Sequence, residues 1–360
     1  MRNKILLFWE DSLEKKGFFF SVLRGFFYLF SLFFRLSVAF WHLMYLYYLL
    51  PEKKENCFVV SVGNITTGGS GKTPIIIYLG KELLQKEQEI AILSRGYLSE
   101  AERKTPLLAC AKKGPLFSWE KIGDEPYMIA KHLPESFLYV GKNRYLSATI
   151  AKKKADILLL DDGFQYRKLK KDLQILCINA EDPLGKGYFL PRGFLREHPK
   201  MLKKADYIVI QPVFNEKEFS RVKQLLLQWT AAPMIGFQPK IEGIYALDGT
   251  KKVFDKSVPI VLFCGIANPK RVVSLLKMEG FTIVDCIFAA DHGPFSNKEL
   301  TQFAAKAKEK SALLLCTEKD AVKLTGSITF PVHYFRYELE PLFGLEYWKM
   351  LIEKIYQKSK

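Results

Sequence analysis

Beyond residue 51, short apolar runs alternate with longer segments whose apolar residues recur every three or four positions. The short runs are rich in Val, Ile and Leu, which is typical of parallel strands covered on both faces. The helical segments between them supply the crossover connections that a parallel sheet requires. The pattern therefore predicts an α/β fold with a mostly parallel sheet. The expected strands of this core are Cys57–Val62, Ile90–Ser94, Phe137–Val140, Ile157–Leu160, Leu173–Asn179 and Tyr207–Gln211, and the expected helices are Thr73–Lys86, Glu125–His132, Asn143–Lys153 and Glu216–Trp229.

From about Ala232 to Lys256 the chain is polar, with Pro, Gly and short alternating pieces, which indicates a linker of β character. A second α/β set then predicts a smaller lobe. Its expected strands are Ile260–Cys264, Phe281–Cys286, Ala312–Cys316 and Val332–Phe335, and its last helix is expected near Gly344–Gln357. The predicted organisation is an amino-terminal helix over 1–50, a core over 51–231, a linker over 232–256 and a carboxy-terminal lobe over 257–360.

The segment Gly17–Leu50 is almost wholly apolar and holds 14 of the 50 aromatic residues of the chain. Its bulky side chains and the lack of a small-residue cleavage site argue against a cleaved signal peptide. Arg24 and Arg35 interrupt the segment, and its longest uncharged run, Leu36–Leu50, is shorter than the ~20 residues that a membrane-spanning helix needs.

Helical spacing places the few polar residues of this segment on one narrow stripe. The stripe consists of Ser21, Arg24, Ser31, Arg35 and His42. A wide apolar face beside a narrow basic stripe predicts a helix that lies in a membrane interface, with its arginines reaching lipid phosphates. A buried core helix is the alternative, but so many aromatic residues would need a very large partner surface.

The charge balance, 54 Lys+Arg against 38 Asp+Glu, leaves a formal +16 and indicates a negatively charged partner. Nucleic acid, an anionic membrane and a phosphorylated substrate all fit. Lysine runs such as Lys152–Lys154 and Lys203–Lys204 lack the interleaved aromatic residues on which single-stranded nucleic acid stacks. The six cysteines form no CxxC, so neither zinc spacing nor a disulfide framework is indicated.

The stretch from Val60 to Pro74 joins an expected strand to an expected helix and contains Gly-Gly-Ser-Gly-Lys-Thr. In this context backbone N–H groups converge on phosphate oxygens, the lysine reaches the β- and γ-phosphates, and the hydroxyl joins Mg²⁺. Thr66 stands where a standard phosphate-binding loop has its first glycine. A glycine-rich turn without a ligand is the alternative, but strand, loop and helix together favour ATP binding. The predicted ATP-binding residues are Gly68, Gly69, Ser70, Gly71, Lys72 and Thr73.

Carboxylates follow a second expected strand. Asp161 and Asp162 come directly after Ile157–Leu160, at the end of the strand where parallel sheets hold Mg²⁺ and phosphate. An Asp-Asp-Gly turn is the alternative. Asp124 and Glu125 form another acidic pair, in which Asp124 is also suited to capping the helix that follows.

Taken together, these stretches resemble the tetraacyldisaccharide 4'-kinase family, which phosphorylates a membrane-embedded glycolipid of the lipid A pathway. The resemblance covers nearly the whole chain. Its motifs are Gly63-Asn64 through Thr73-Pro74, Ser94-Arg95-Gly96-Tyr97, Gly123-Asp124-Glu125-Pro126, Asp161-Asp162-Gly163-Phe164-Gln165, Leu190-Pro191-Arg192-Gly193, Leu195-Arg196-Glu197, Cys264 through Pro269, Asp291-His292 and Thr317 through Leu324.

The resemblance implies a P-loop core joined by a β-ribbon to a smaller α/β lobe. It implies ATP and Mg²⁺ as cofactors and a lipid A disaccharide precursor as acceptor. It also implies Asp124 as the base for the sugar hydroxyl, assisted by His292, with Lys72 neutralising phosphate charge. The implied metal positions are Thr73, Glu125, Asp161 and Asp162, and the implied substrate or phosphate contacts are Tyr97, Arg144, Gln165 and Arg196.

Such an enzyme is expected at the cytoplasmic face of the inner membrane of a Gram-negative-type bacterium, on an anionic surface and without nucleic acid or an obligate protein partner. Two positions depart from the family pattern, Lys186 and Gly293. One rival is a membrane-associated P-loop NTPase without a lipid acceptor, although Thr67 replaces the second lysine that such loops often carry. The other is a basic module without enzymatic activity.

Overall fold

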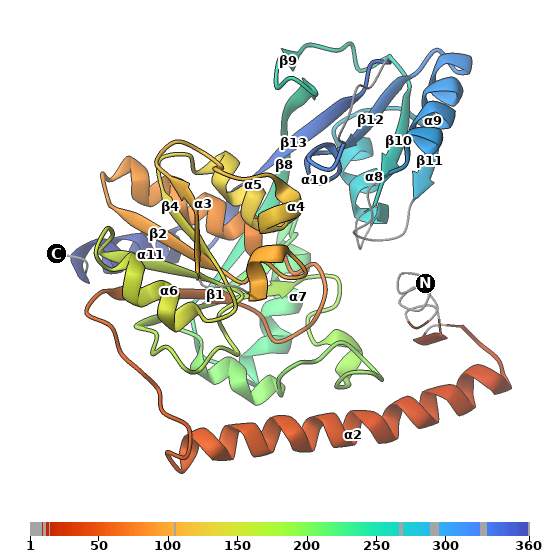
Figure 1. Cartoon of the computed structure of the whole chain (residues 1–360). Coiled ribbons are helices and arrows are strands. Elements are labelled where there is room, and N and C mark those ends of the chain that lie inside the picture. Colours follow the sequence, from red (N-terminus) through yellow and green to blue (C-terminus); the bar gives the residue numbers. More distant parts are fainter. Residues whose placement is uncertain are drawn as a thin grey trace. The chain divides into compact units, whose positions relative to one another are not determined.

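The computed structural model describes residues 9, 12–13, 15–103, 106–265, 269–288, 295–324 and 330–358. The chain forms two compact units (Figure 1). The larger contains Glu10–Gln238 and Glu340–Lys360, and the smaller is built mainly from Pro239–Leu339. Two strands, β8 (Met234–Ala246) and β13 (His333–Phe343), each have residues in both units.

The larger unit contains a sheet with the strand order β7-β6-β1-β5-β2-β4-β3. All pairs in this order are parallel except β3 with β4, and the first residues of β8 pair in parallel with β7. The mostly parallel sheet predicted from the apolar runs is thus confirmed. The strands are β1 (Phe58–Gly63), β2 (Ile90–Ser94), β3 (Leu107–Ala111), β4 (Phe137–Val140), β5 (Ile157–Asp161), β6 (Leu173–Asn179) and β7 (Tyr207–Gln211).

Both faces of this sheet are buried, because successive residues of a strand point to opposite sides. Val59 and Leu158 pack with Ala148 of one helix, while their neighbours Val60 and Leu159 are also fully buried. This arrangement explains why the strands have continuous apolar sequences. The helices of the unit are α2 (Phe18–Leu46), α3 (Lys72–Gln85), α4 (Trp119–Ile122), α5 (Asp124–His132), α6 (Arg144–Ala151), α7 (Glu216–Leu227) and α11 (Leu345–Lys358), with 3-10 turns at Glu100–Arg103, Gly185–Gly187 and Pro199–Lys204.

The smaller unit has a parallel sheet of order β11-β10-β12-β13. Helix α9 covers one face, where Phe303 packs with Phe263, and α8 covers the other, where Leu276 packs with Leu262. The short β9 pairs antiparallel with the end of β8, so the predicted linker contains a β-hairpin. The remaining elements are β9 (Lys251–Lys252), β10 (Ile260–Cys264), α8 (Pro269–Met278), β11 (Ile283–Phe288), α9 (Asn297–Glu309), β12 (Leu313–Thr317) and α10 (Glu318–Ala321).

The last helix differs from the sequence prediction, which assigned residues 257–360 to the second lobe. Helix α11 belongs instead to the larger unit. Its Trp348 is 2% exposed, and the ring lies 5.4 Å from Tyr78 of α3 and 5.1 Å from Phe237 of β8. An aromatic cluster of this size buries enough apolar area to hold the helix there. Strand β13 returns the chain to that position.

Helix α2 packs along the larger unit through the polar stripe predicted from its sequence. Ser31 is buried, His42 hydrogen-bonds Glu197 at 2.7 Å, and the Phe34 ring lies 6.2 Å from Phe189. Arg24 donates to the carbonyl of Lys15 at 2.6 Å. Ser31 and His42 of the stripe thus face protein, whereas Ser21 and Arg35 are exposed. The buried carboxylate of Glu197 pairs with His42, and Arg24 donates to main-chain carbonyls of the segment before the helix. The expectation that the arginines reach lipid phosphates stays a prediction.

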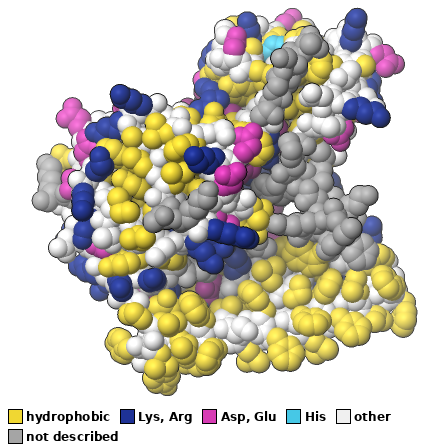
Figure 2. Space-filling model, in the orientation of Figure 1, with side chains coloured by type: hydrophobic (Ala, Val, Ile, Leu, Met, Phe, Trp, Pro, Cys, Tyr) yellow, Lys and Arg dark blue, Asp and Glu magenta, His cyan; other side chains and the backbone are white. Residues whose placement is uncertain are grey.

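The opposite face of α2 is exposed and apolar. Figure 2 shows hydrophobic side chains gathered along this helix, and it is long and apolar enough to cross a membrane by length and composition. An apolar surface of this extent marks a membrane or protein contact. The exposed large residues of the helix and the turn after it include Phe18, Phe19, Phe26, Phe30, Phe33, Leu36, Phe40, Trp41, Leu46, Tyr47, Tyr48 and Leu49.

The packing of α11 generates a stability prediction. Trp348→Ala is expected to cost about 3–5 kcal/mol, because it empties a buried aromatic site between α3 and β8. Urea unfolding followed by circular dichroism measures this loss. Met350→Ala on the same helix is the control: Met350 is 58% exposed, so its change is expected to stay within about 0.5 kcal/mol. Equal effects of the two substitutions would contradict the placement of α11.

Candidate active site

The predicted phosphate-binding and acidic motifs meet at one edge of the larger sheet. Strands β1, β5 and β2 are neighbours and parallel, so their carboxyl ends lie side by side. The glycine-rich loop follows β1, Asp161 ends β5 and Ser94 ends β2. This edge is where open parallel sheets bind ligands.

The loop between β1 and α3 leaves room for a phosphate group. Gly71 has a φ of 73°, a left-handed conformation that favours glycine, and α3 begins at the next residue. A Cβ atom at Gly71 would collide with the side-chain amide of Gln211, which donates to the Gly71 carbonyl at 2.9 Å. Gly68 and Gly69 are exposed, and Cβ atoms placed on them would meet no atom within 4 Å. The outer side of the loop is therefore open at the start of a helix, where anions bind.

Two cations hold the Asp162 carboxylate. Arg196 donates to both of its oxygens, at 2.7 and 2.9 Å, and Lys72 Nζ lies 3.6 Å from Oδ1. Burial alone would raise the pKa of Asp162, but Lys72 and Arg196 outweigh it and hold that pKa well below its usual range. Asp162 is therefore ionised and fixes both cations beside the loop.

Asn64 connects the loop to this ion pair. Its side-chain nitrogen donates to Ser70 Oγ at 2.7 Å, and its side-chain oxygen accepts from Arg196. Gln165 donates to the Asn64 carbonyl at 2.9 Å. Lys72 also lies 3.4 Å from Ser70 Oγ. One buried amide thus sets the positions of the loop, the lysine and the arginine together.

The pKa of Asp161 is shifted in the opposite direction from that of Asp162. Asp161 is 5% exposed, its Oδ2 accepts from Ser94 Oγ at 2.8 Å, and its Oδ1 has no hydrogen-bond partner in the part of the chain that the structure describes. Burial, followed by the charges of Glu125 and Asp162, raises the pKa of Asp161 to about 7. A buried carboxylate with an open oxygen is suited to receive a cation.

The motifs after β2 and before α5 pack against each other. Gly96 has a φ of 63°, and a Cβ atom there would lie 2.9 Å from the carbonyl oxygen of Ile122. Asp124 opens α5, where its Oδ1 accepts from the N–H of Glu125 at 2.9 Å. The close contact at Gly96 brings the beginning of α5 to the edge of the sheet that carries Asp161.

Arg144 is buried at the start of α6. It stacks over the Tyr166 ring at 4.1 Å and donates to the Lys142 carbonyl at 3.0 Å. Burial lowers the pKa of this arginine, while the charges of Asp162 and Asp161 oppose that shift. It therefore supplies positive charge near the two carboxylates.

The structure brings most of the predicted site residues together, but not all. Tyr97 is 61% exposed and lies beneath the Arg95 guanidinium. His292 is outside the described residues. Within those residues, no group of three or more His, Cys, Asp or Glu side chains is arranged to hold a metal by itself.

Sequence reasoning gave no role to three residues that make contacts at this site: Asn64 and Ser94, which lie in the family motifs, and Gln211, which lies in none. Each is the last residue of a strand or follows one directly. Their position at strand ends was the available signal.

Comparisons with known proteins agree with this geometry. A family model described as "Tetraacyldisaccharide-1-P 4'-kinase" matches residues 23–355. The chain is 38% identical over 270 residues to a tetraacyldisaccharide 4'-kinase of Chlamydia caviae, covering 74% of this chain and 72% of the relative. It is 32% identical over 340 residues to one of Syntrophus aciditrophicus, covering 90% of each chain.

Among solved structures, the fold is similar to the "apo" form of LpxK from Aquifex aeolicus in complex with ATP. The TM-score is 0.73 at 29% sequence identity, and the match covers 92% of this chain and 99% of that one. The family expected from the motifs is confirmed by these matches. The chain belongs to the tetraacyldisaccharide-1-phosphate 4'-kinase family.

Proposed function

We propose that this protein transfers the γ-phosphate of ATP to the 4'-hydroxyl of a tetraacyldisaccharide 1-phosphate at a membrane surface. The observation that carries the proposal is the fixed cluster of Lys72, Asp162 and Arg196 beside an open glycine-rich loop. Phosphoryl transfer needs positioning and charge neutralisation more than covalent chemistry. Family membership supports the choice of acceptor.

The ATP phosphates are proposed to bind between the loop and this cluster. Backbone N–H groups of the loop from Gly68 to Gly71 are proposed to bind them, although the Ser70 N–H donates to the Gly68 carbonyl at 2.9 Å in the ligand-free loop, and the amino terminus of α3 adds its dipole. Lys72 Nζ already lies 3.6 Å from Asp162, and its side chain is largely buried. Little desolvation of this lysine is therefore needed when phosphate binds. Arg196 and Arg144 supply further positive charge for the oxygens of the transferred group.

The residues present fit Mg²⁺. Asp161 has a buried oxygen without a partner among the described residues, and its raised pKa reports the cost of an unneutralised charge there. Mg²⁺ prefers a few carboxylate and hydroxyl oxygens together with substrate phosphates, so Thr73, Glu125 and Asp161 are the proposed ligands. Asp162 was expected as another ligand, but its oxygens already bind two cations, and we assign it to hold Lys72 and Arg196. When bound, Mg²⁺ would neutralise β- and γ-phosphate oxygens.

Asp124 is proposed to accept the proton of the sugar hydroxyl, and His292 to orient or stabilise it. Asp124 lies in the first turn of α5, where the helix dipole favours a carboxylate. The start of this helix packs against the loop after β2, near Asp161. The pairing with His292 rests on the family resemblance.

A membrane site for the reaction is supported by the exposed apolar face of α2, and we propose the cytoplasmic side of an inner membrane. No nucleic acid and no obligate protein partner are part of this proposal. An NTPase without a lipid acceptor would share the loop but would consume ATP without glycolipid.

Lys72→Ala is expected to lower phosphoryl transfer by about 10²–10³-fold, because it removes a positive charge aimed at the reacting phosphates. Transfer of labelled phosphate from ATP to tetraacyldisaccharide 1-phosphate in mixed micelles measures the loss. Lys86→Ala, at the other end of α3 and in an exposed ion pair with Glu353, is the control and is expected to retain activity. Strong ATP hydrolysis by the unmodified protein without glycolipid would support the NTPase alternative.

Asp124→Ala is expected to reduce kcat by roughly 10²–10⁴-fold, the range for loss of a general base, with little change in the KM for ATP. The pH profile of the residual activity should also lose its acidic limb. Glu120→Ala, an exposed carboxylate of the preceding helix, is the matched control. Near-normal kinetics of the Asp124 variant across the pH range would exclude the assignment as base.

Asp161→Asn is expected to abolish transfer and yet stabilise the ligand-free protein at pH 8. The folded-state pKa of Asp161, about 7, lies above its unfolded value, so the folded state holds an extra proton between about pH 4 and 7. Stability of the unmodified protein therefore falls as pH rises through this window. The Asn variant has no carboxylate to ionise at this position and so does not lose stability in this window. Its Tm should therefore exceed that of the unmodified protein by several degrees at pH 8 and by little at pH 4.

Asp156→Asn is the control for this effect, since Asp156 is exposed at the start of the same strand. Its Tm should match that of the unmodified protein at both pH values. A Tm of the Asp161 variant below that of the unmodified protein at pH 8 would show that the ionised Asp161 carboxylate does not destabilise the folded protein.

A further inference from the structure

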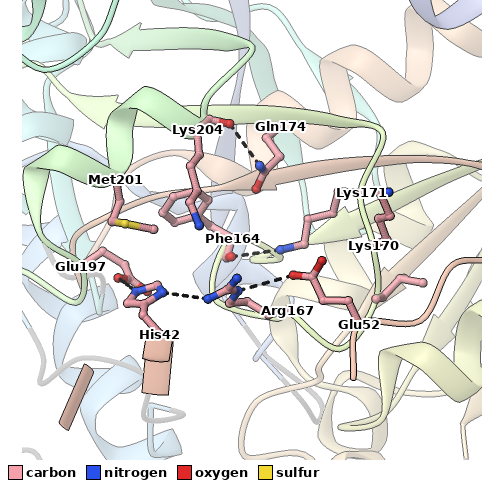
Figure 3. A pocket seen from close by; sticks show the side chains of 11 residues that line it. His42, Glu52, Phe164, Arg167, Lys170, Lys171, Gln174, Glu197, Met201 and Lys204 are labelled. Carbon is pink, nitrogen blue, oxygen red and sulfur yellow. Dashed lines mark hydrogen bonds and ion pairs between the residues drawn. The ribbon is translucent and has the colours of Figure 1, made fainter. Parts of the chain in front are cut away.

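Within the larger unit, a cavity of about 150 Å³ lies where the carboxyl-terminal end of α2 packs against the segments that carry Arg167 and Glu197 (Figure 3). We call it the basic pocket. Its lining has four cationic side chains and two carboxylates, and its volume is roughly ten times what a single water requires. The charged lining residues are Arg167, Lys170, Lys171, Lys204, Glu52 and Glu197, with His42 between them.

Both carboxylates are already engaged within the wall of the pocket. Glu197 lies 2.7 Å from His42 Nε2, and Arg167 lies 3.0 Å from His42 Nδ1. Because arginine only donates, His42 Nδ1 accepts, and Nε2 carries the hydrogen that is donated to Glu197. Glu52 lies 3.5 Å from Arg167 Nε. Figure 3 shows this chain of contacts along one side of the pocket.

The lysines of the pocket lack carboxylate partners within the described ranges. Lys170, Lys171 and Lys204 have no carboxylate within ion-pair distance among the described residues, and Lys171 donates to the Phe164 carbonyl at 3.0 Å. Burial lowers the pKa of Lys171 to about 7; Glu52 opposes this, while Arg167 and Lys204 lower it further. An anion entering the pocket would relieve the repulsion among these groups.

The same end of α2 carries aromatic residues with polar tips. Trp41, Tyr47 and Tyr48 are 48%, 68% and 92% exposed beside exposed Phe and Leu residues, whereas Tyr28 is the only exposed Trp or Tyr in the earlier described turns. Trp and Tyr prefer the headgroup level of a bilayer, and Phe and Leu prefer its apolar interior. Trp41, Tyr47 and Tyr48 therefore favour a position of the pocket mouth near the level of lipid headgroups.

We propose that the basic pocket binds the phosphate headgroup of an anionic bilayer phospholipid and so fixes α2 at the membrane surface. The site is separate from the glycine-rich loop: Phe164 and Glu197 line the pocket, while their neighbours Gln165 and Arg196 contact Asn64. The proposal rests on the membrane association inferred above, and its test does not depend on catalysis.

The test is flotation of the full-length protein with phosphatidylcholine vesicles that contain or lack phosphatidylglycerol. Lys171→Gln combined with Lys204→Gln is the pocket variant. Lys153→Gln combined with Lys217→Gln, at two exposed positions outside the pocket, is the control with the same change in formal charge. The pocket variant is expected to bind the anionic vesicles on the order of tenfold more weakly than the control, since each lysine near a membrane contributes a several-fold effect. Binding to pure phosphatidylcholine should be equal for all three proteins, and equal Tm values would confirm folding.

Equal losses for the two double variants on anionic vesicles would overturn the proposal in favour of diffuse charge attraction. Two further results would also overturn it. A selective rise in the KM for the glycolipid, measured in neutral detergent micelles, would assign the pocket to the acceptor. Equal binding of the pocket variant and the control to anionic vesicles, with inorganic phosphate raising the Tm of the unmodified protein but not of the pocket variant, would assign the pocket to free phosphate. Failure to bind any vesicle would instead contradict the membrane association itself.

Discussion

Two adjacent carboxylates at the end of a buried strand impose the main constraint on the larger unit. In a medium of low dielectric, neighbouring like charges cannot both remain ionised unless cations reach them. The protein treats the pair asymmetrically, with two cations on Asp162 and a single hydroxyl on Asp161. The loop after β1, the segment carrying Arg196 and the end of β2 must all converge on this point. The positions of these three segments at the site are therefore linked by one local charge requirement.

Helix α2 satisfies a second requirement, the pairing of polar groups on an otherwise apolar helix. Ser31 and His42 of its stripe contact the body of the protein, and its aromatic face is exposed. The structure also shows where part of the formal charge of +16 lies. Part of it surrounds the carboxylates of the site, and part lines the basic pocket at the end of the helix. Both locations are matched to phosphate chemistry.

Much of the fold was predictable from the sequence because buried parallel strands require continuous apolar runs. The strands β1 and β5 were expected within one residue, and the loop between β1 and α3 was recognised from its glycines. The pairing of His42 with Glu197 was not predictable, since spacing along a helix shows which residues share a face but not what that face contacts. The packing of Trp348 and the contact of Gln211 with Gly71 join residues far apart in the chain, which local patterns do not report. The assignments of Asp124 and His292 remain predictions from the family motif.

The two strands shared by both units mean that the smaller unit is an insertion within the sequence of the larger one. During synthesis, residues 239–339 leave the ribosome before α11 does. The aromatic site formed by Tyr78 and Phe237 therefore has to wait for Trp348 while about a hundred residues are added, which takes on the order of ten seconds at typical elongation rates. Throughout that interval the nascent kinase core carries an uncovered apolar face beside α3, and completion of the smaller unit precedes completion of the larger.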